Sequence, residues 1–255
     1  MGIPLFAIRE FIKYKFRAKN AHGIHSPFVF NLYNEVISKQ DKSLSESCRR
    51  IRTETFRSKA RIEYTNPKTG HKRDEIFANW AKRVTSTKKF NVFLIQLINH
   101  LEVKTVLETG TAAGINASCL SLSNASRIVT IEGSNEISKI AQEVISRFGG
   151  EKVELIQGNV KDIFEEVLTN QAPDLVFLDA DHRSETIEFY LDSIEHTTQQ
   201  PKCILVHDIY WSKDMHQAWK RIVNSDKYTL TIDLFEVGLI FPNFPAQKQD
   251  FSIQF

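Results

Sequence analysis

Apolar runs and amphipathic segments alternate over the second half of the chain. Five short apolar runs, each leading into polar residues, are typical of buried parallel strands and span residues 105–107, 127–132, 153–159, 174–182 and 203–208. Between them, apolar residues at helical spacing predict helices from residue 116 onward and over 135–148, 160–168, 184–196 and 211–223. With two more strands at 228–233 and 236–241, the pattern predicts an α/β fold: a seven-stranded, mostly parallel, doubly wound, Rossmann-like sheet.

The first part of the chain is predicted to be helical. Apolar spacing predicts helices over 4–19, 26–38, 74–84 and 90–101. Ser26 is expected to cap the second of these helices, with Pro27 at its first position. We divide the chain into a basic helical N-terminal extension at 1–84 and a sheet-containing domain at 85–255.

Residues 4–19 form a basic amphipathic pattern whose apolar positions are Leu5, Ile8, Phe11, Ile12 and Phe16. Three interpretations stay open. The helix packs on the domain, or it forms a homodimer interface, or it rests on an acidic membrane surface or nucleic acid.

Residues 39–75 are the most polar part of the chain and carry a run of cations at Arg49, Arg50, Arg52, Arg57, Lys59 and Arg61. Such a run is typical of a solvated helix face or a mobile loop. The functional alternative is a lid over the active site or a clamp on an acidic substrate. Residues 66–70 are predicted to form a turn.

Composition limits the classes of protein to be considered. Of 255 residues, 42% are apolar, which is enough for a large core. The three cysteines are widely spaced, so neither a zinc site nor a disulfide framework is indicated. No apolar run reaches the roughly 18 residues needed to span a bilayer. The N-terminus lacks a cationic segment and a cleavage site, so we expect no signal peptide and a cytoplasmic location.

Charge is divided unevenly along the chain. Residues 1–90 contain 20 Lys and Arg against 8 Asp and Glu, a net charge of +12. Residues 91–255 contain 13 against 23, a net charge of −10. This asymmetry raises the possibility of an anionic partner for the N-terminal part.

The most specific motif follows the first strand. It is an acid and a glycine turn, Glu108-Thr109-Gly110-Thr111-Ala112-Ala113-Gly114, which leads into a helix. Backbone N–H groups at such a turn can hold a polar ligand, and the glycines permit close approach. The spacing is not that of a dinucleotide fingerprint or a phosphate loop, and the acid suits an amine-bearing ligand.

Two later strand ends extend this pattern. Glu132 ends the second strand 22 residues after Gly110, near the offset at which an acid meets a ribose diol. Asn159 follows the third strand, where its amide suits the edge of a base. Polar residues also end the fourth and fifth strands, and open parallel sheets bind ligands at the carboxyl ends of their strands.

On these motifs the sequence resembles the class I S-adenosylmethionine-dependent methyltransferases, over roughly residues 85–241. In that family the last two strands form an antiparallel pair. The resemblance implies S-adenosylmethionine as cofactor, bound by Glu108, Gly110, Thr111, Gly114, Glu132, Gly133, Asn159, Val160 and Asp179. The N-terminal segment His22-Gly23-Ile24-His25-Ser26-Pro27-Phe28 resembles uncharacterised bacterial members.

Two further segments, Leu178-Asp179-Ala180-Asp181-His182 and Val206-His207-Asp208-Ile209, resemble the metal-dependent catechol and caffeoyl-coenzyme-A O-methyltransferases. That resemblance implies Asp179 and Asp208 as ligands of a divalent cation. Ile209 stands where that family has an asparagine ligand and His182 where it has a lysine, so a hard cation loses an oxygen donor.

The same residues allow other chemistry. Methyl transfer needs a deprotonated acceptor, and Asp179, His182, His207 and Asp208 are the candidate catalytic residues that supply a base. Two Asp with two His also suit a transition metal such as manganese, iron or zinc. Alternatively, the two aspartates only end their strands and bind the cofactor's amine.

Our reading is an enzyme that transfers a methyl group to a hydroxyl of a small molecule. One rival is an RNA methyltransferase, motivated by the basic N-terminal part. Residues 39–75 lack interleaved aromatics of the kind that stack on bases, so RNA is a weaker candidate for the methyl acceptor than a small molecule. The other rival is a cofactor-binding scaffold without turnover.

Overall fold

The structure, a computed structural model, describes residues 5–65 and 70–255. The chain packs into two compact units, one of residues 39–163 and one of residues 1–38 with 164–255. The predicted boundary between residues 84 and 85 stays a prediction. The predicted turn at 66–70 lies outside the described residues apart from Gly70.

The unit of residues 39–163 holds the glycine motif. Its parallel strands β3 (Thr105–Thr109), β4 (Arg127–Glu132) and β5 (Val153–Gln157) run in the order β3-β4-β5. The helices of this unit are α3 (Lys42–Thr55), α4 (Phe77–Val84), α5 (Lys88–His100), α6 (Ile115–Leu120) and α7 (Asn135–Phe148), with the short 3-10 helix Gly150–Lys152. Helix α8 (Val160–Gln171) starts here and continues into the other unit.

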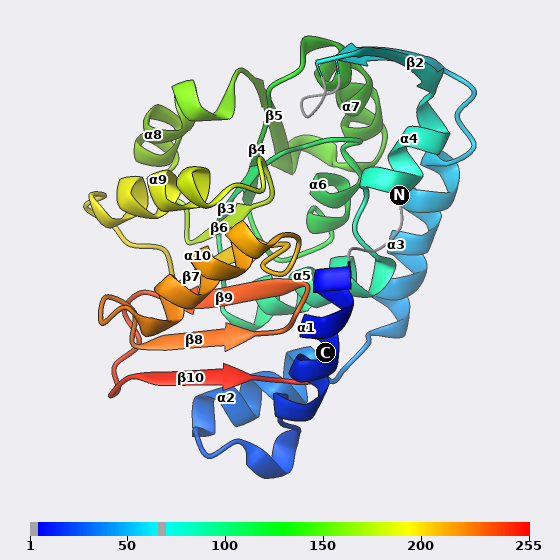
Figure 1. Ribbon diagram of the computed structural model, residues 1–255. Helices are drawn as coiled ribbons and strands as arrows, with labels where there is room; N and C mark the ends of the chain where they lie inside the picture. The colour runs from blue at the N-terminus through cyan, green and yellow to red at the C-terminus, as the bar shows by residue number, and fades with distance from the viewer. Residues whose placement is uncertain (1–4, 66–69) are drawn as a thin grey trace. The chain divides into compact units, whose positions relative to one another are not determined.

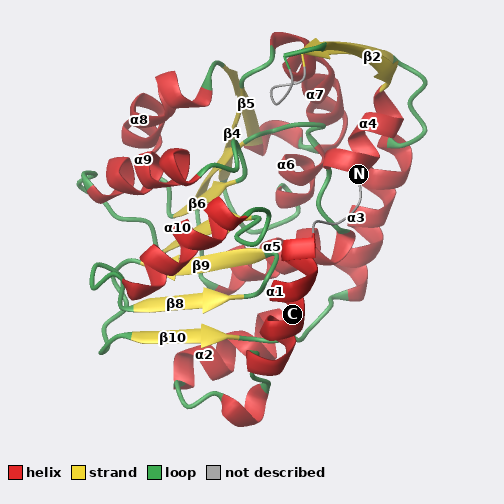
Figure 2. Cartoon of the chain, in the orientation of Figure 1, coloured by secondary structure: helices red, strands yellow, loops and turns green. Residues whose placement is uncertain are grey.

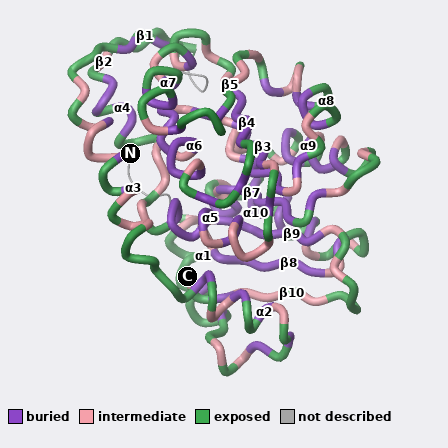
Figure 3. The backbone as a smooth tube through the Cα atoms, turned by 180° about the vertical axis from the view of Figure 1, so that it is seen from behind, coloured by how far each residue is buried: buried purple, intermediate pink, exposed green. Residues whose placement is uncertain are grey.

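The second unit holds β6 (Leu175–Leu178), β7 (Cys203–His207), β8 (Leu230–Asp233), β9 (Val237–Phe241) and β10 (Gln249–Ser252), in the order β10-β8-β9-β7-β6. Its helices are α1 (Leu5–Arg17), α2 (Pro27–Leu32), α9 (Ser184–Glu195) and α10 (Lys213–Asn224), with a 3-10 turn at Ala21–Gly23 and a π-helical turn at Tyr33–Ile37 (Figure 2). Strands β7 and β9 are buried throughout, whereas β10 is only partly covered (Figure 3).

The predicted fold class is confirmed, with one strand more than expected. The mostly parallel sheet has eight described strands rather than seven. The predicted antiparallel pair is present, because β9 runs antiparallel to both β7 and β8. The extra strand, β10, lies parallel to β8. Its burial is intermediate and its sequence, Gln249-Asp250-Phe251-Ser252, is polar, so it carries no continuous apolar signal.

The predicted structure of residues 39–84 needs two corrections. Residues 61–65 and 72–76 form an antiparallel hairpin, β1 and β2, so the helix predicted from residue 74 starts only at Phe77. The polar segment before it contains α3, which buries Cys48, Ile51 and Thr55 while its cations pair with acids, as Arg50 does with Glu54 at 2.9 Å. The cationic run is therefore a solvated helix face only at Arg49 and Arg50, because Arg52 donates to the Ser86 carbonyl and the other three cations lie beyond α3.

Local features near the N-terminus differ in part from expectation. Ser26 precedes α2 and Pro27 opens it, as predicted, but the Ser26 side chain makes no capping hydrogen bond. Helix α1 packs beside the C-terminal segment, where Lys19 N–H donates to the Ser252 carbonyl at 2.8 Å (Figure 1). The three cysteines are buried free thiols. Among the described residues, no helix has the length and apolar character that crossing a membrane requires.

Candidate active site

The glycine motif forms a tight turn after β3 in which three residues have positive φ. They are Gly110 at 90°, Ala112 at 48° and Gly114 at 71°. A Cβ at Gly114 would lie 2.9 Å from the carbonyl oxygen of Ala141, so this position requires glycine for packing as well as for backbone conformation. Gly110 and Thr111 N–H groups both donate to the Ile131 carbonyl, at 2.9 and 3.1 Å, which fixes the turn against β4.

Glu132, at the end of β4, joins two turns. One carboxylate oxygen accepts from Ala112 N–H at 2.9 Å and the other from Ser134 N–H at 2.9 Å. Burial raises the pKa of Glu132, although these backbone N–H groups oppose the effect. The strand end predicted to meet a ribose therefore carries a carboxylate held rigidly by the glycine turn and the start of α7.

Glu108 lies deeper than the sequence suggests, because only 1% of its surface is exposed. Its carboxylate accepts from the amide of Asn116 and, at 2.6 Å, from the hydroxyl of Thr130. Thr130 also shares a 2.7 Å hydrogen bond with Thr111, and Asn116 accepts from Asn91 at 2.7 Å. This buried network ties the glycine turn to α5, α6 and β4, and a ligand-binding role for Glu108 stays a prediction.

The remaining cofactor candidates of this unit surround the end of β5. Gly133 follows β4, and a Cβ added to it would lie 3.9 Å from the carbonyl oxygen of Gly158. Asn159 precedes α8, where its side-chain oxygen accepts from Lys161 N–H at 3.2 Å. Val160 opens the helix and is buried. The carboxyl ends of β3, β4 and β5 thus carry Gly110, Glu132 and Asn159 on one edge, as expected for a parallel sheet.

The candidate catalytic residues form a second cluster, in the other unit, at the ends of β6 and β7. His207 Nδ1 lies 2.8 Å from Asp179 Oδ1 and 3.8 Å from Asp208 Oδ1. Its other ring nitrogen, Nε2, lies 3.7 Å from Glu236 Oε1. The structure therefore brings together Asp179, His207 and Asp208 as the strand ends predict, and adds Glu236.

His207 is buried among these acids, with 8% of its surface exposed. Burial by itself would lower the pKa of His207, but the carboxylates of Asp179, Glu236 and Asp208 outweigh it and hold the pKa well above the ordinary 6.5. This shift favours the protonated ring, which lies between carboxylates from three segments.

His182 occupies a more open position in the same cluster. Its Nε2 lies 3.7 Å from Asp208 Oδ2, and its ring lies 5.8 Å from that of Trp211, which is 44% exposed. Asp208 has a φ of +57°, a left-handed conformation that is uncommon for a residue other than glycine and is frequent at functional sites. This backbone turn lets one carboxylate face both histidines.

Neighbouring polar residues are engaged elsewhere. Asp181 accepts from Arg183 at 2.8 Å and from Thr186 at 2.8 Å, which anchors the start of α9. Tyr210 is buried and donates to Asp233 at 2.6 Å, while Trp211 beside it is exposed. Of the two aromatic residues after Asp208, only Trp211 is available to line an acceptor pocket.

The donor set does not fit the divalent cation that the resemblance implies. Among the described residues, no group of three His, Cys, Asp or Glu side chains has an arrangement that could hold a metal ion. Ile209 is fully buried and supplies no oxygen, and the Asp179 oxygen faces the cationic ring of His207 instead. Asp179 is thus already held by His207, whose Nδ1 lies 2.8 Å from its Oδ1, and the loss of the asparagine oxygen at position 209 leaves a hard cation short of donors.

Glu236 is the one acid of the His207 cluster that the sequence did not indicate. It lies in the turn between β8 and β9, where Phe235 has a φ of +68° and the Glu236 carbonyl accepts from Asp208 N–H at 2.8 Å. A single acid before an apolar strand carries no spacing signal toward His207, which is 29 positions earlier. Only the antiparallel pairing of β7 with β9, which places His207 opposite Val237, reveals the contact.

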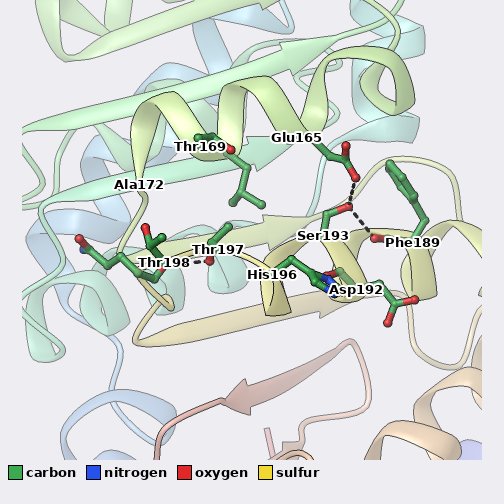
Figure 4. A pocket seen from close by; sticks show the side chains of 11 residues that line it. Glu165, Thr169, Ala172, Phe189, Asp192, Ser193, His196, Thr197 and Thr198 are labelled. Atoms are coloured by element: carbon green, nitrogen blue, oxygen red, sulfur yellow. Dashed lines mark hydrogen bonds between the residues drawn. The ribbon is translucent and has the colours of Figure 1, made fainter.

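A separate cavity of about 480 Å³ lies between the C-terminal ends of α8 and α9 (Figure 4). Ser193 there donates to Glu165 at 3.0 Å, and His196 and Asp192 face the same cavity. These helix ends lead into the starts of β6 and β7, whereas Asp179 and His207 lie at the opposite, carboxyl ends. The cavity is therefore not part of the candidate active site.

The fold, the glycine turn and the strand-end acids define a class I methyltransferase. The chain belongs to the O-methyltransferase family, whose family model matches residues 71–219, more than half of the chain. It is accordingly an S-adenosylmethionine-dependent enzyme that methylates oxygen.

Several solved structures share the fold of this chain. An S-adenosylhomocysteine-bound methyltransferase from Podospora anserina, PaMTH1, is 16% identical, with 93% of this chain and 95% of that chain covered and a TM-score of 0.57. An O-methyltransferase from Bacillus cereus in complex with S-adenosylhomocysteine is 17% identical, with 79% and 92% covered and a TM-score of 0.53. A candidate caffeoyl-CoA O-methyltransferase from Staphylococcus aureus is 19% identical, with 64% and 88% covered and a TM-score of 0.54. At these identities the likeness concerns the fold. No curated protein sequence matches the chain.

Proposed function

We propose that this enzyme methylates a hydroxyl group of a small molecule, with His182 as the general base and without a divalent cation. The observation that carries the proposal is the difference in surroundings between two histidines. His207 is a buried imidazolium held by Asp179 and Glu236. His182 is more open and has Asp208 at 3.7 Å.

The cofactor supplies a methyl group on a sulfonium sulfur, and transfer to oxygen releases the sulfur as a neutral thioether. The chain's own residues handle the proton. His182 accepts the proton of the acceptor hydroxyl as the oxygen–carbon bond forms, and Asp208 stabilises the resulting imidazolium. A phenol, whose pKa is about 10, is within reach of such a base, and Trp211 offers an apolar wall for its ring.

His207 has a different role in this proposal. Its fixed positive charge lies beside Asp179 and Asp208, where the cation-dependent relatives hold their metal according to the sequence resemblance. The imidazolium favours a developing alkoxide or phenolate nearby, and it holds Asp179 and Asp208 in place. Because the shift favours its protonated form and only 8% of its surface is exposed, we assign the base to His182 rather than to His207.

On the cofactor side, we propose that the glycine turn with Glu132 binds S-adenosylmethionine. The residues suit it: Gly110 takes a positive φ of 90° in the turn after β3, Gly114 lets that turn pack closely on α7, and Glu132 presents a rigid carboxylate for a ribose diol. Gly133, Asn159 and Val160 surround the same strand ends. The roles of Thr111, Glu108 and Asp179 toward the cofactor stay predictions.

The test is methyl transfer from labelled S-adenosylmethionine to a panel of phenols and catechols, with EDTA present. We expect His182→Gln to lower the rate by a factor of about 10² to 10⁴, the usual contribution of a general base, with little change in cofactor affinity. His196→Gln is the matched control, since this exposed histidine lies at the far end of α9. A rate that requires added magnesium or manganese, or an unchanged rate in His182→Gln, would contradict the proposal.

The RNA methyltransferase and scaffold alternatives are not favoured, since the chain belongs to a family of O-methyltransferases. The cytoplasmic location and the homodimer through the N-terminal helices stay predictions.

A further inference from the structure

Helix α1 packs on its unit through a mixed face, on which Phe6 contacts the His216 ring and Phe11 contacts the Phe235 ring beside buried polar residues. Glu10 and Tyr14 are the buried residues of this helix, at 8% and 1% exposure. The Tyr14 hydroxyl donates to the Ile253 carbonyl, and Arg17 donates to Asp233 at 2.8 Å and to Tyr210 at 2.7 Å. These contacts fix the rotation of the helix, so its other face is turned outward.

The outward face carries a stripe of large apolar side chains. Leu5 is 85% exposed, Ile8 43%, Ile12 52% and Phe16 89%. At 100° per residue these four positions fall within an arc of about 80°, so they form one line along the helix. They account for four of the ten large apolar side chains that are exposed among the described residues, and such grouping marks an interaction surface. We call these four residues the α1 stripe.

Cations border the α1 stripe on both sides. By the same helical geometry, Arg9 and Lys13 lie along one edge and Lys15 along the other, and all three are exposed. The one acid of the helix, Glu10, is buried and paired with Lys13 at 2.7 Å. The exposed face of α1 thus presents apolar side chains between positive charges and no negative charge.

We propose that α1 docks this protein on an anionic lipid surface, with the α1 stripe inserted among the headgroups and the bordering cations paired with phosphates. This arrangement is the one by which amphipathic helices lie in the plane of a membrane interface. The helix is about 20 Å long and lies along the surface rather than across the bilayer. The inference rests on α1 alone and does not depend on the proposed catalytic residues.

Charge argues against a second copy of the chain as the occupant. Two α1 stripes facing each other would bring Arg9 and Lys15 of one copy against the same cations of the other, and the one acid of the helix, Glu10, is buried and already paired with Lys13. Four side chains along 13 residues are also a small surface beside the roughly 800 Å² per partner that stable complexes bury.

The experiment is flotation of the full-length protein with vesicles of pure phosphatidylcholine or of phosphatidylcholine mixed with phosphatidylserine. We expect binding to the mixed vesicles only, weakening as salt is raised. Ile12→Gln with Phe16→Gln should weaken binding by at least about tenfold, since two large apolar side chains no longer leave water. The control is Phe30→Gln, which alters a 44% exposed aromatic residue on α2.

Both substituted positions are exposed, so we expect the variants to fold, and melting curves check this. Failure of the wild type to bind mixed vesicles overturns the proposal, as does equal binding by the stripe variant. Equal binding to both vesicle types removes the role of the cations and also overturns it. A wild-type dimer that the stripe substitutions dissociate would assign the surface to a second copy, and binding to RNA in place of vesicles would assign it to nucleic acid.

Discussion

His207 shows how a single side chain can determine the chemistry of a strand end. The same two aspartates that suggest a metal site in the sequence instead face a buried imidazolium, at 2.8 Å for Asp179 and 3.8 Å for Asp208. The sequence contains His207 and both acids, yet nothing in their spacing shows that the ring lies between them. The decisive partner, Glu236, comes from a different hairpin turn.

The raised pKa of His207 makes a prediction about stability and pH. A group whose pKa is higher in the folded state stabilises that state fully below its unfolded value of 6.5, and the contribution is lost as pH rises through the folded value. We expect His207→Gln to lower the free energy of unfolding at pH 6 by about 1 to 3 kcal/mol, since the carboxylates lose their buried counter-charge.

The measurement is urea unfolding of wild type and His207→Gln across pH 6 to 10, a window that starts just below the unfolded pKa of about 6.5. The difference between the two proteins should shrink toward alkaline pH. His25→Gln, at an exposed position, should follow the wild type throughout. A difference that is constant with pH would show that the ring is not charged in the native state.

At the scale of elements, the apolar pattern predicts those helices and strands that bury an apolar face in the core. Helix α7 spans Asn135–Phe148 as predicted, because its buried residues repeat at helical spacing and Ser134 caps it. Strands β3 to β7 follow from apolar runs, and β8 and β9 fall within the two further segments predicted at 228–233 and 236–241. The misses have a common cause: β1, β2 and β10 are polar or partly exposed strands, stabilised by pairing rather than by burial of an apolar run.

The rotation of α1 could not be predicted either. Its apolar spacing predicts a helix, and the helix is present, but the buried face follows the partners of Tyr14 and Arg17 at the far end of the chain. Contacts separated by more than 200 residues leave no local signal in the sequence. Similarly, the candidate site was predicted down to its strand-end residues, whereas the contacts among them were not.

Strand β9 and helix α10 pack closely enough for a specific prediction. A Cβ added to Gly238 would lie 2.4 Å from the ring of Trp219. We expect Gly238→Ala to lower the free energy of unfolding by about 1 to 3 kcal/mol through overpacking. Because Trp219→Leu makes room for the methyl group, the double variant should be more stable than the sum of the single effects predicts. Strictly additive effects, measured by urea unfolding, would contradict this packing.

His216 couples α10 to α1 and gives a prediction for acidic pH. It is buried, lies 3.7 Å from Glu10, and stacks on Tyr210. Burial, with the nearby cations Lys220, Arg17 and Lys13, lowers the pKa of His216 to about 4 despite Glu10. The unfolded chain therefore binds a proton that the folded chain does not, and stability is lost as pH falls from about 6.5 toward 4.

The expected loss is up to about 3 kcal/mol over this range, from a shift of roughly 2.5 units at about 1.4 kcal/mol each. His216→Phe keeps a stacking ring without the titrating group, so its unfolding free energy should fall less than that of the wild type. The comparison is by urea unfolding at pH 7, 5.5 and 4. Parallel curves for the two proteins would rule out His216 as the source of acid sensitivity.

At the scale of the whole molecule, charge follows the compact units rather than the order of the chain. Residues 39–90 carry +9 of the +12 and share a unit with residues 91–163, at −2, so that unit has a net charge of +7 and the other unit −5. Much of the cationic run in α3 and β1 is paired, for instance Arg61 with Asp74 at 2.7 Å. The asymmetry that suggested RNA in the sequence is thus partly neutralised in the fold, and exposed cations remain beside the α1 stripe.

The central claim is that the glycine turn with Glu132 binds S-adenosylmethionine without a metal. The most direct measurement is calorimetric titration with S-adenosylmethionine in the presence of EDTA, on wild type, Glu132→Ala, Glu132→Gln and the control Glu136→Ala, an exposed acid in the first turn of α7. We expect binding by wild type and the control, and at least about a hundredfold weaker binding by Glu132→Ala, in line with the loss of a charged acceptor for two hydroxyls. No binding by folded wild type, or equal binding by Glu132→Ala, would contradict the account.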